Sequence, residues 1–164
     1  MTERNRGVIL VVDDSPSNVQ YLSEVLTGRG HAVHAATDGM RAIRAARDLL
    51  PDLVLLDIVM PQLDGFKVCQ FLKNSDETRD IPVIFMTSLS DTRDKIKGFE
   101  LGAADYVTKP FQVEEVLARV ETILALRTMQ KRLEVNNAEL QGANRELKLY
   151  QEELERLLRA LPVR

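Results

Sequence analysis

The sequence predicts an α/β fold for most of the chain, a parallel sheet with helices on both of its faces. Short apolar runs, such as residues 8–12 and 53–56, have the length and aliphatic content of buried strands. Segments with apolar residues at helical spacing alternate with these runs, and Gly, Pro, Asp and Ser mark the connections. Strands that alternate with helices favour a parallel sheet built through right-handed crossovers.

The bulk properties indicate a soluble protein with one domain and an appendage. The chain has 164 residues, of which 45% are hydrophobic and 29% are charged. A formal net charge of −3 provides no positive field for a nucleic-acid backbone, so direct nucleic-acid binding is not expected. The single Cys69 excludes an intrachain disulfide framework. We find no signal peptide or membrane-inserted segment and therefore expect a cytoplasmic protein.

The first strand, residues 8–12, runs directly into Asp13 and Asp14. Ser15 is a suitable N-cap for the helix that follows, and Pro16 suits its first turn. The inner stripe of this helix and the glycines that end it are Leu22, Val25, Leu26, Gly28 and Gly30.

Residues 32–36 form a weaker second strand. We interpret His31 and His34 as flanking or solvent-facing residues rather than metal ligands, because no third ligand lies at a useful spacing. Asp38 and Gly39 open a second helix, which Pro51 closes. The inner stripe of that helix is predicted to contain Ala42, Ile43, Ala46, Leu49 and Leu50.

The third strand, residues 53–56, runs directly into Asp57, and its loop leads to a third helix. Phe66, Cys69 and Leu72 form the apolar face of that helix, where Cys69 is expected to be a buried small hydrophobe rather than a reactive thiol.

The remaining elements continue the same alternation. A fourth strand is predicted at residues 81–86, and a fifth at residues 104–107. The fourth helix, which Asp91 could cap, carries Ile96 and Phe99 and ends near Gly102. The apolar face of the final helix comprises Val113, Val116, Leu117, Val120 and Leu124. The predicted architecture is a flavodoxin-like, doubly wound (βα)5 domain with a five-stranded parallel sheet.

Polar residues follow the strands of this sheet where each strand ends. They are Asp13 and Asp14, Asp57, Thr87 and Lys109. The carboxyl ends of parallel strands meet at one edge, so these side chains are expected to converge. Clustered carboxylates repel one another unless a divalent cation lies among them, and oxygen ligands of this kind suit Mg²⁺. Asp57 is then placed to attack a phosphate donor, with Lys109 and Thr87 contacting the transferred group.

Four motifs together resemble the receiver domain of two-component response regulators. They cover residues 11–15, 55–65, 86–88 and 102–111, and the resemblance extends over residues 7–126. We therefore expect a receiver domain at residues 1–126 and a helical extension at 127–164.

The resemblance implies a role for each site residue. Asp57 would be the phosphoacceptor, and Asp13, Asp14 and Asp57 would hold Mg²⁺ together with the Val59 carbonyl. Lys109 would contact the phosphoryl group, and Thr87 would be paired with a switching aromatic residue. That aromatic residue is Tyr106, and the Lys109-Pro110 peptide bond is expected to be cis.

The resemblance also implies partners. A sensor histidine kinase or phosphotransfer protein would supply the phosphoryl group. Four charged residues match positions that pair across a dimer face in one DNA-binding subfamily, although Leu101 does not fit that pattern. The four residues are Lys95, Asp105, Glu115 and Arg119.

Beyond Leu124 the helical pattern continues with a leucine every seven residues. An isolated helix cannot bury this stripe, so the pattern predicts a parallel coiled-coil homodimer that extends the last helix. Asn136 would fix its register, whereas Gly142 weakens the helix. The alternatives are folding back onto the domain or ordering only beside an output domain beyond residue 164. The seam comprises Leu126, Met129, Leu133, Asn136, Leu140, Ala143, Leu147, Tyr150, Leu154, Leu157 and Leu161.

Three other functions are weighed against a regulatory phosphoacceptor that signals to an output domain or partner. An aspartyl phosphatase normally has a second carboxylate two residues after its nucleophile, where this chain has Val59. An FMN module would bind phosphate through backbone amides and hydroxyls, where this chain has Asp13 and Asp14. The third is a stand-alone dimeric adaptor or scaffold that acts by protein contacts alone. We expect a regulatory protein and not an enzyme.

Overall fold

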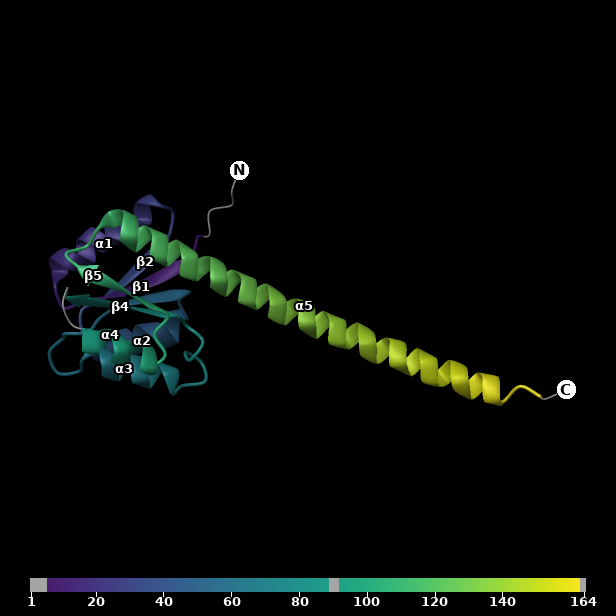
Figure 1. Cartoon of the computed structure of the whole chain (residues 1–164). Helices are drawn as coiled ribbons and strands as arrows, with labels where there is room; N and C mark the ends of the chain where they lie inside the picture. Colours follow the sequence, from purple (N-terminus) through teal and green to yellow (C-terminus); the bar gives the residue numbers. More distant parts are fainter. Residues whose placement is uncertain (1–5, 89–91, 163–164) are drawn as a thin grey trace. The chain divides into compact units, whose positions relative to one another are not determined.

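Five parallel strands form one sheet in the computed structural model, which describes residues 6–88 and 92–162 (Figure 1). The order β2-β1-β3-β4-β5 means that the chain winds from β1 to one edge and from β3 to the other. The predicted flavodoxin-like, doubly wound architecture is confirmed. The strands are β1 Val8–Val12, β2 Ala32–Ala36, β3 Leu53–Asp57, β4 Val83–Ser88 and β5 Asp105–Lys109.

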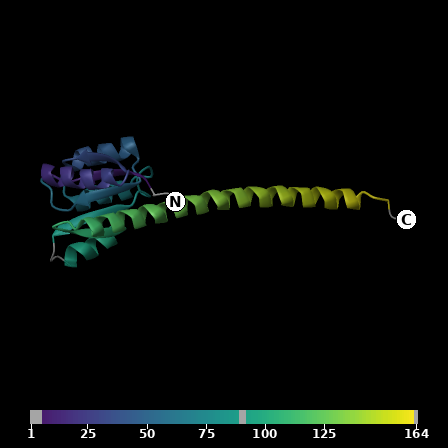
Figure 2. The ribbon, with the colours of Figure 1, turned by 90° about the horizontal axis from the view of Figure 1, so that it is seen from above.

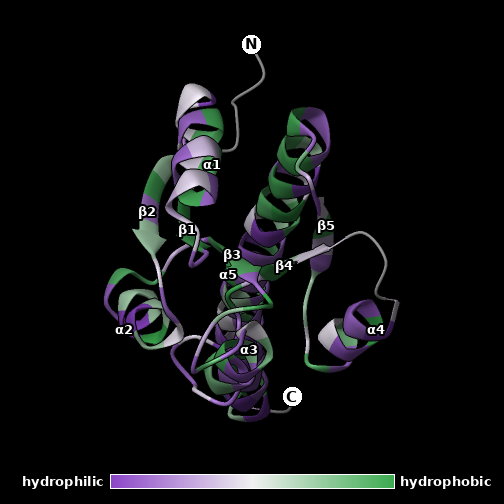
Figure 3. Ribbon diagram, turned by 90° about the vertical axis from the view of Figure 1, so that its left-hand side faces the viewer, coloured by the Kyte–Doolittle hydropathy of each residue, from purple (hydrophilic) through white to green (hydrophobic). Residues whose placement is uncertain are grey.

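Helices cover both faces of the sheet. Figure 3, viewed toward one edge of the layers, shows α1 and α5 on one side and α2, α3 and α4 on the other. Each of the five strands is followed by one of these helices, as the alternating pattern predicts. The helices are α1 Pro16–Gly28, α2 Gly39–Leu49, α3 Gly65–Lys73, α4 Thr92–Glu100 and α5 Val113–Arg159.

The continuous apolar runs of the central strands follow from burial on both faces. Along β1, Leu10 and Val12 join the core beneath α2 and α3, whereas Ile9 and Val11 join the core beneath α1 and α5. Successive strand residues point to opposite faces, so a strand covered on both sides needs apolar residues at every position. All four side chains are fully buried.

Side-chain caps start three of the helices. The Ser15 hydroxyl accepts a hydrogen bond from the Asn18 amide at 3.5 Å, as predicted for the start of α1. Asp38 and Asp64 accept bonds from the backbone amides three residues later, at 2.8 and 2.9 Å. The expected cap of α4, Asp91, lies outside the described residues.

Two details of the predicted packing are wrong. Leu49 and Leu50 were placed on the inner stripe of α2, but their side chains are exposed. Leu50 has a φ of 45°, so the chain turns away from the helical path before a further turn can bury it. His31 flanks β2, as one of the two predicted alternatives had it, but its side chain is buried, and its Nδ1 accepts a hydrogen bond from the Gly7 amide at 3.2 Å. Its pKa is lowered, chiefly by burial.

Strands β4 and β5 extend further toward their carboxyl ends than the apolar pattern indicates. Thr87 pairs with Thr108 and Ser88 pairs with Lys109 in the parallel ladder between them. Ladder pairing depends on the backbone, so polar residues can continue a strand after the apolar run has ended. Two of the expected site residues, Thr87 and Lys109, therefore belong to the sheet itself.

Contacts divide the chain into two compact units, Met1–Arg127 and Thr128–Arg164. We refer to the first as the globular unit and to the second as the tail. Helix α5 is continuous from Val113 to Arg159 and contributes to both units (Figure 2). Val116, Leu117, Val120 and Leu124 are buried in the globular unit, as predicted. No helix in the described parts of the chain has the length and hydropathy needed to cross a membrane.

Candidate functional site: an acidic cleft at the strand ends

Three carboxylates meet at the carboxyl edge of the sheet. Asp13 and Asp14 follow β1, and Asp57 is the last residue of the neighbouring strand β3. Each offers an oxygen, and these oxygens lie within 4.8 Å of one another. Asp13 and Asp57 are almost completely buried, whereas Asp14 is exposed. The structure thus brings together side chains that are 43 or more positions apart in the sequence.

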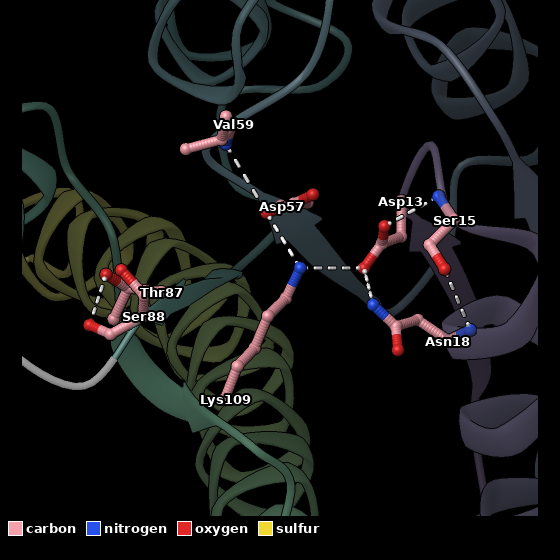
Figure 4. A network of polar contacts seen from close by, with 8 residues as sticks. All are labelled: Asp13, Ser15, Asn18, Asp57, Val59, Thr87, Ser88 and Lys109. Atoms are coloured by element: carbon pink, nitrogen blue, oxygen red, sulfur yellow. Dashed lines mark hydrogen bonds and ion pairs between the residues drawn. The ribbon is translucent and has the colours of Figure 1, made fainter.

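Lys109 joins two of these carboxylates. Its Nζ lies 3.1 Å from Asp13 Oδ2 and 3.1 Å from Asp57 Oδ1, and Figure 4 shows the ammonium group between them. The lysine is the last residue of β5, which places it at the same sheet edge. The peptide bond from Lys109 to Pro110 is cis. An ammonium group in this position offsets part of the repulsion between the two buried acids.

Asp13 is held in place by two further donors. Its Oδ1 accepts the Ser15 backbone amide at 2.9 Å, and its Oδ2 accepts the side-chain amide of Asn18 at 3.1 Å (Figure 4). Asn18 was not among the predicted site residues. It lies in the first turn of α1, four residues after Asp14, and that spacing could have indicated a polar side chain facing the strand end.

Burial and the neighbouring acid disfavour the charged form of Asp57. Loss of solvent and the nearby Asp13 carboxylate raise the pKa of Asp57 to about 6, although Lys109 and the Val59 amide oppose the shift. The Val59 amide donates to Asp57 Oδ1 at 3.3 Å. Burial alone would lower the pKa of Lys109, but its contacts with Asp13 and Asp57 raise it overall. Lys109 is therefore a cation, and Asp57 keeps its proton to a higher pH than an ordinary aspartate does.

A cleft of about 220 Å³ opens above these groups. Asp13, Asp14, Asp57 and Lys109 line it, together with Thr87 at the end of β4. The Thr87 hydroxyl donates to the Ser88 carbonyl at 3.3 Å rather than to a carboxylate, and Figure 4 shows both residues to one side of the acids. The cleft has room for a small anion and water between the threonine and the acidic cluster.

Tyr106 does not line this cleft. Its ring packs edge-on to Phe99 of α4, with centroids 5.9 Å apart, and Lys95 Nζ lies 4.3 Å from the ring centroid. It borders a second, much smaller cavity of about 10 Å³, which Thr87 also lines. The two predicted switch residues are thus neighbours of the same small cavity rather than of the same cleft.

Gly65 shapes the loop beside Asp57. A Cβ added to this glycine would lie 2.2 Å from the Asp57 carbonyl oxygen, so any side chain would collide with the strand end. The Gly65 amide donates to the Ile58 carbonyl at 2.9 Å and closes the turn. The sequence motif contained this glycine, but only the structure shows that it allows α3 to begin directly against Asp57.

The four charged residues of the suggested dimer face have partners within their own chain. Arg119 contacts both carboxylate oxygens of Asp105 at 2.8 and 2.9 Å, and it contacts Glu115 at 3.3 Å. Lys95 lies over the Tyr106 ring. Pairing across two copies would require these contacts to be exchanged.

The donor set fits a hard divalent cation. Carboxylate oxygens with one exposed member provide an open, oxygen-only site, and Mg²⁺ typically binds one or two carboxylates and keeps several waters. Lys109 balances only part of the charge of Asp13, Asp14 and Asp57. A metal ion at this position would complete the neutralisation, and it would favour the ionised form of Asp57 despite its raised pKa.

The chain matches the family model of the response regulator receiver domain over residues 9–121. The DNA-binding dual master transcriptional regulator RpaA of Synechocystis is 47% identical over 116 residues, which are 71% of this chain and 48% of that protein. The response regulator PleD of Caulobacter vibrioides is 45% identical over 115 residues, which are 70% of this chain and 25% of that protein. The chain therefore spans half or less of the length of these curated relatives.

Solved structures agree with this assignment. A response regulator from Chloroflexus aurantiacus superposes with a TM-score of 0.71 at 36% identity and covers 73% of this chain and 98% of its own. The chemotaxis protein CheY4 of Vibrio cholerae superposes with a TM-score of 0.69 at 28% identity and covers 72% of this chain and 98% of its own. With its sheet order, its acidic cleft and these relatives, the chain belongs to the response regulator receiver family, a family of regulatory domains.

Proposed function

We propose that this protein is a phosphoacceptor that receives a phosphoryl group on Asp57 and passes the signal through its helical tail. The observation that carries the proposal is the position of Lys109 Nζ, 3.1 Å from both Asp13 and Asp57. This arrangement brings together a carboxylate nucleophile, a fixed cation for the phosphoryl oxygens and an adjacent acidic metal site.

The chemistry follows from the cleft. A carboxylate oxygen of Asp57 attacks the phosphorus of a phosphohistidine, and the P–N bond breaks as the imidazole leaves. Asp13, Asp14 and Asp57, with the Val59 carbonyl, would hold Mg²⁺, which supplies charge stabilisation for the transferring group. Lys109 pairs with one phosphoryl oxygen. The donor would be a sensor histidine kinase or a phosphotransfer protein.

The response would begin with Thr87 and Tyr106. Thr87 lines both the cleft and the small cavity beside Tyr106. Turning the hydroxyl toward a phosphoryl oxygen at Asp57 would exchange its bond to the Ser88 carbonyl for a charge-assisted one. That movement would enlarge the cavity on the Tyr106 side, into which the ring can turn.

The tail is proposed to act as a parallel coiled-coil homodimer that connects the receiver to an output domain or partner. A leucine recurs every seventh residue from Leu133 to Leu161, and the five leucines of this series are 58–61% exposed. A second copy would cover this stripe. The relatives extend well beyond the matched region, and RpaA is named as DNA-binding, which supports an output function outside the residues described here.

The charges beside the leucine stripe favour the parallel orientation. In the heptad frame that places Leu140 and Leu147 at a positions, Glu139, Glu146 and Glu153 occupy g positions. The partner e positions in a parallel pair hold mostly uncharged amides, such as Asn144 and Gln151. An antiparallel pair would set the glutamates against one another, which costs stability.

Phosphorylation can be tested with a small phosphodonor. Phosphoramidate and Mg²⁺ should add about 80 Da to the wild-type chain, and the Asp57→Asn variant should acquire no adduct because it lacks the nucleophile. EDTA should prevent the modification, since the acidic cluster depends on a metal. Intact-mass spectrometry measures both effects. Persistence of the adduct in Asp57→Asn would reject Asp57 as the phosphoacceptor. Modification that is unaffected by EDTA would reject the requirement for Mg²⁺.

A further inference from the structure

Asp13 accepts three hydrogen bonds, two of them at the same oxygen. Its Oδ1 accepts the Ser15 amide at 2.9 Å, and its Oδ2 accepts both Asn18 Nδ2 and Lys109 Nζ at 3.1 Å. A carboxylate oxygen has roughly two lone-pair sites, so these two donors use the capacity of Oδ2. The carboxylate is completely buried. Asn18 and Lys109 therefore share one buried acceptor.

The two donors to this oxygen differ in how far they can move. Asn18 lies in the first turn of α1, which Ser15 caps, and its short side chain ends at Asp13 (Figure 4). Lys109 comes from β5, its side chain is 27% exposed, and its Nζ also lies 3.1 Å from Asp57 Oδ1. Because the ammonium is carried on a flexible four-carbon chain, it can turn within the cleft, whereas the amide stays beside the acid.

A phosphoryl group on Asp57 would change the demand on Lys109. Phosphoryl oxygens carry more negative charge than a carboxylate and attract the ammonium more strongly. As Nζ turns toward them, its contact with Asp13 Oδ2 lengthens. Asp13 has no access to solvent and its Oδ1 is tied to Ser15, so it gains no replacement by rotating outward. A buried charged oxygen that loses its last donor is costly, and this cost would arise only in the modified state.

We propose that Asn18 is a positioning residue that allows Lys109 to turn to the phosphoryl group, because it remains as a donor to Asp13 Oδ2. The unmodified state has two donors at this oxygen and tolerates the loss of one. The modified state depends on Asn18. The inference rests on the proposed function, since it requires a phosphoryl group or its mimic on Asp57. It assigns a role in the reaction to a residue outside the acidic cluster.

The first test compares two affinities of the full chain by calorimetry, for Mg²⁺ alone and for beryllofluoride, an anionic phosphoryl mimic, at saturating Mg²⁺. Asn18→Ala should bind the mimic about tenfold more weakly than wild type, because a hydrogen bond to a buried charge is missing in the bound state. Its Mg²⁺ affinity should change by less than about twofold, because Lys109 still donates to Asp13 before the mimic binds. Equal losses in both affinities would show that Asn18 only supports the metal site, which would overturn the inference.

Two further variants separate the lost donor from other effects. Gln20→Ala removes an exposed side-chain amide of the same helix, which donates to Glu24 at 3.3 Å, and should match wild type in both affinities. Asn18→Asp keeps the size of the side chain but has no amide donor, so it should bind the mimic at least as weakly as Asn18→Ala. Wild-type affinity in Asn18→Asp would show that the shape of the side chain matters rather than its donor, and would contradict the proposal.

The second test uses the wild-type chain and so does not depend on how a variant folds. The side-chain amide protons of Asn18 are followed by NMR with Mg²⁺ alone and then with added beryllofluoride. The proton that is bonded to Asp13 should move downfield when the mimic binds, because its hydrogen bond strengthens as the competing ammonium turns away. An unchanged or upfield resonance would mean that Lys109 does not leave Asp13.

The outcomes separate this inference from the proposed function. If wild type binds beryllofluoride and Asn18→Ala binds it equally well, Asn18 has no part in releasing Lys109 and the receiver function stands. If wild type itself does not bind the mimic in the presence of Mg²⁺, the acceptor assignment fails and the role of Asn18 falls with it.

Discussion

The globular unit and the tail differ most in what happens to their leucines. In the globular unit, Leu10 and Leu56 are completely buried between the sheet and its helices. In the tail, Leu140 and Leu147 are 61% and 59% exposed, and every residue from 129 to 162 is exposed in the single chain. The globular unit thus buries its leucines within a single chain. The tail has the leucine spacing of a coiled-coil interface, but its leucines are exposed in the single chain.

This difference means that the stability of the two units should depend differently on protein concentration. Folding of a self-contained domain is unimolecular, but a helix whose apolar stripe needs a second copy is stabilised by mass action. In the proposed mechanism, the signal arises in the globular unit, which buries its own core, and is transmitted by the tail, which needs a second copy. Changes in one unit should therefore leave the other largely intact.

The strongest expected effect is loss of assembly when charge is placed in the tail seam. Leu140→Asp together with Leu147→Asp should convert the proposed dimer to a monomer, because four carboxylates would meet at an apolar interface. Sedimentation should show half the mass, and circular dichroism should show less helix. The matched control, Ala138→Asp with Gln141→Asp, adds the same charge at two positions outside the seam and should remain dimeric. A wild-type chain that is already monomeric would contradict the proposed seam.

A large effect within the globular unit is expected from Gly65→Ala. The new methyl group would lie 2.2 Å from the Asp57 carbonyl oxygen, so the loop or the strand end must move. We expect a loss of about 3–5 kcal/mol in the free energy of unfolding, together with slower phosphorylation. Gly28→Ala, where nothing lies within 4 Å of the added atom, is the control and should be close to neutral. Equal stability of the two variants in denaturant titrations would show that the close approach does not hold in solution.

A third effect concerns pH and should also be confined to the globular unit. The pKa of Asp57 is about 6 in the folded protein and 3.8 as its ordinary value, so the folded state binds this proton more tightly. The stabilisation of the folded state by protonated Asp57 is complete below pH 3.8 and is lost as the pH rises through 6. Relative to Asp57→Asn, metal-free wild type should therefore lose up to about 3 kcal/mol of stability between these limits.

Denaturant titrations in EDTA across this pH range measure that loss, and added Mg²⁺ should reduce it because a cation favours the ionised carboxylate. Identical pH profiles for wild type and Asp57→Asn would mean that Asp57 titrates as an ordinary surface acid.

The smallest expected effect is a gain in stability when a glycine of the tail is replaced by alanine. Gly142 lies in the middle of α5, and nothing lies within 4 Å of an added Cβ. Gly142→Ala should stabilise the helical tail by about 1 kcal/mol per chain through helix propensity alone. This is the opposite of the result for Gly65→Ala. The dissociation temperature of the dimer measures the gain, and a decrease would indicate that Gly142 is packed against a partner.

Much of the fold and the site could be predicted because the strands are marked by apolar runs and the site residues lie where these runs end. Apolar runs located the five strands, and the parallel arrangement required Asp13, Asp57 and Lys109 to share an edge. Periodicity was less informative where a helix ends: Leu49 and Leu50 fit the pattern, but the left-handed turn at Leu50 exposes them.

The details that escaped prediction depend on distances between elements. The bond from Asn18 to Asp13, and the closeness of Gly65 to the Asp57 carbonyl, arise from how helices start beside strands. The place of Thr87 between two cavities depends on how α4 lies on the sheet. Periodicity and spacing report which face a residue occupies, but not how closely two elements approach.

The central claim is that Asp57 carries the modification because Lys109 and the acidic cluster surround it. The most direct measurement is peptide mapping of the wild-type chain after treatment with phosphoramidate and Mg²⁺. The account predicts a single adduct of about 80 Da on the peptide that contains Asp57, and loss of most of that adduct in Lys109→Ala. An adduct on Asp13, Asp14 or another residue, or no adduct on folded protein, would contradict it.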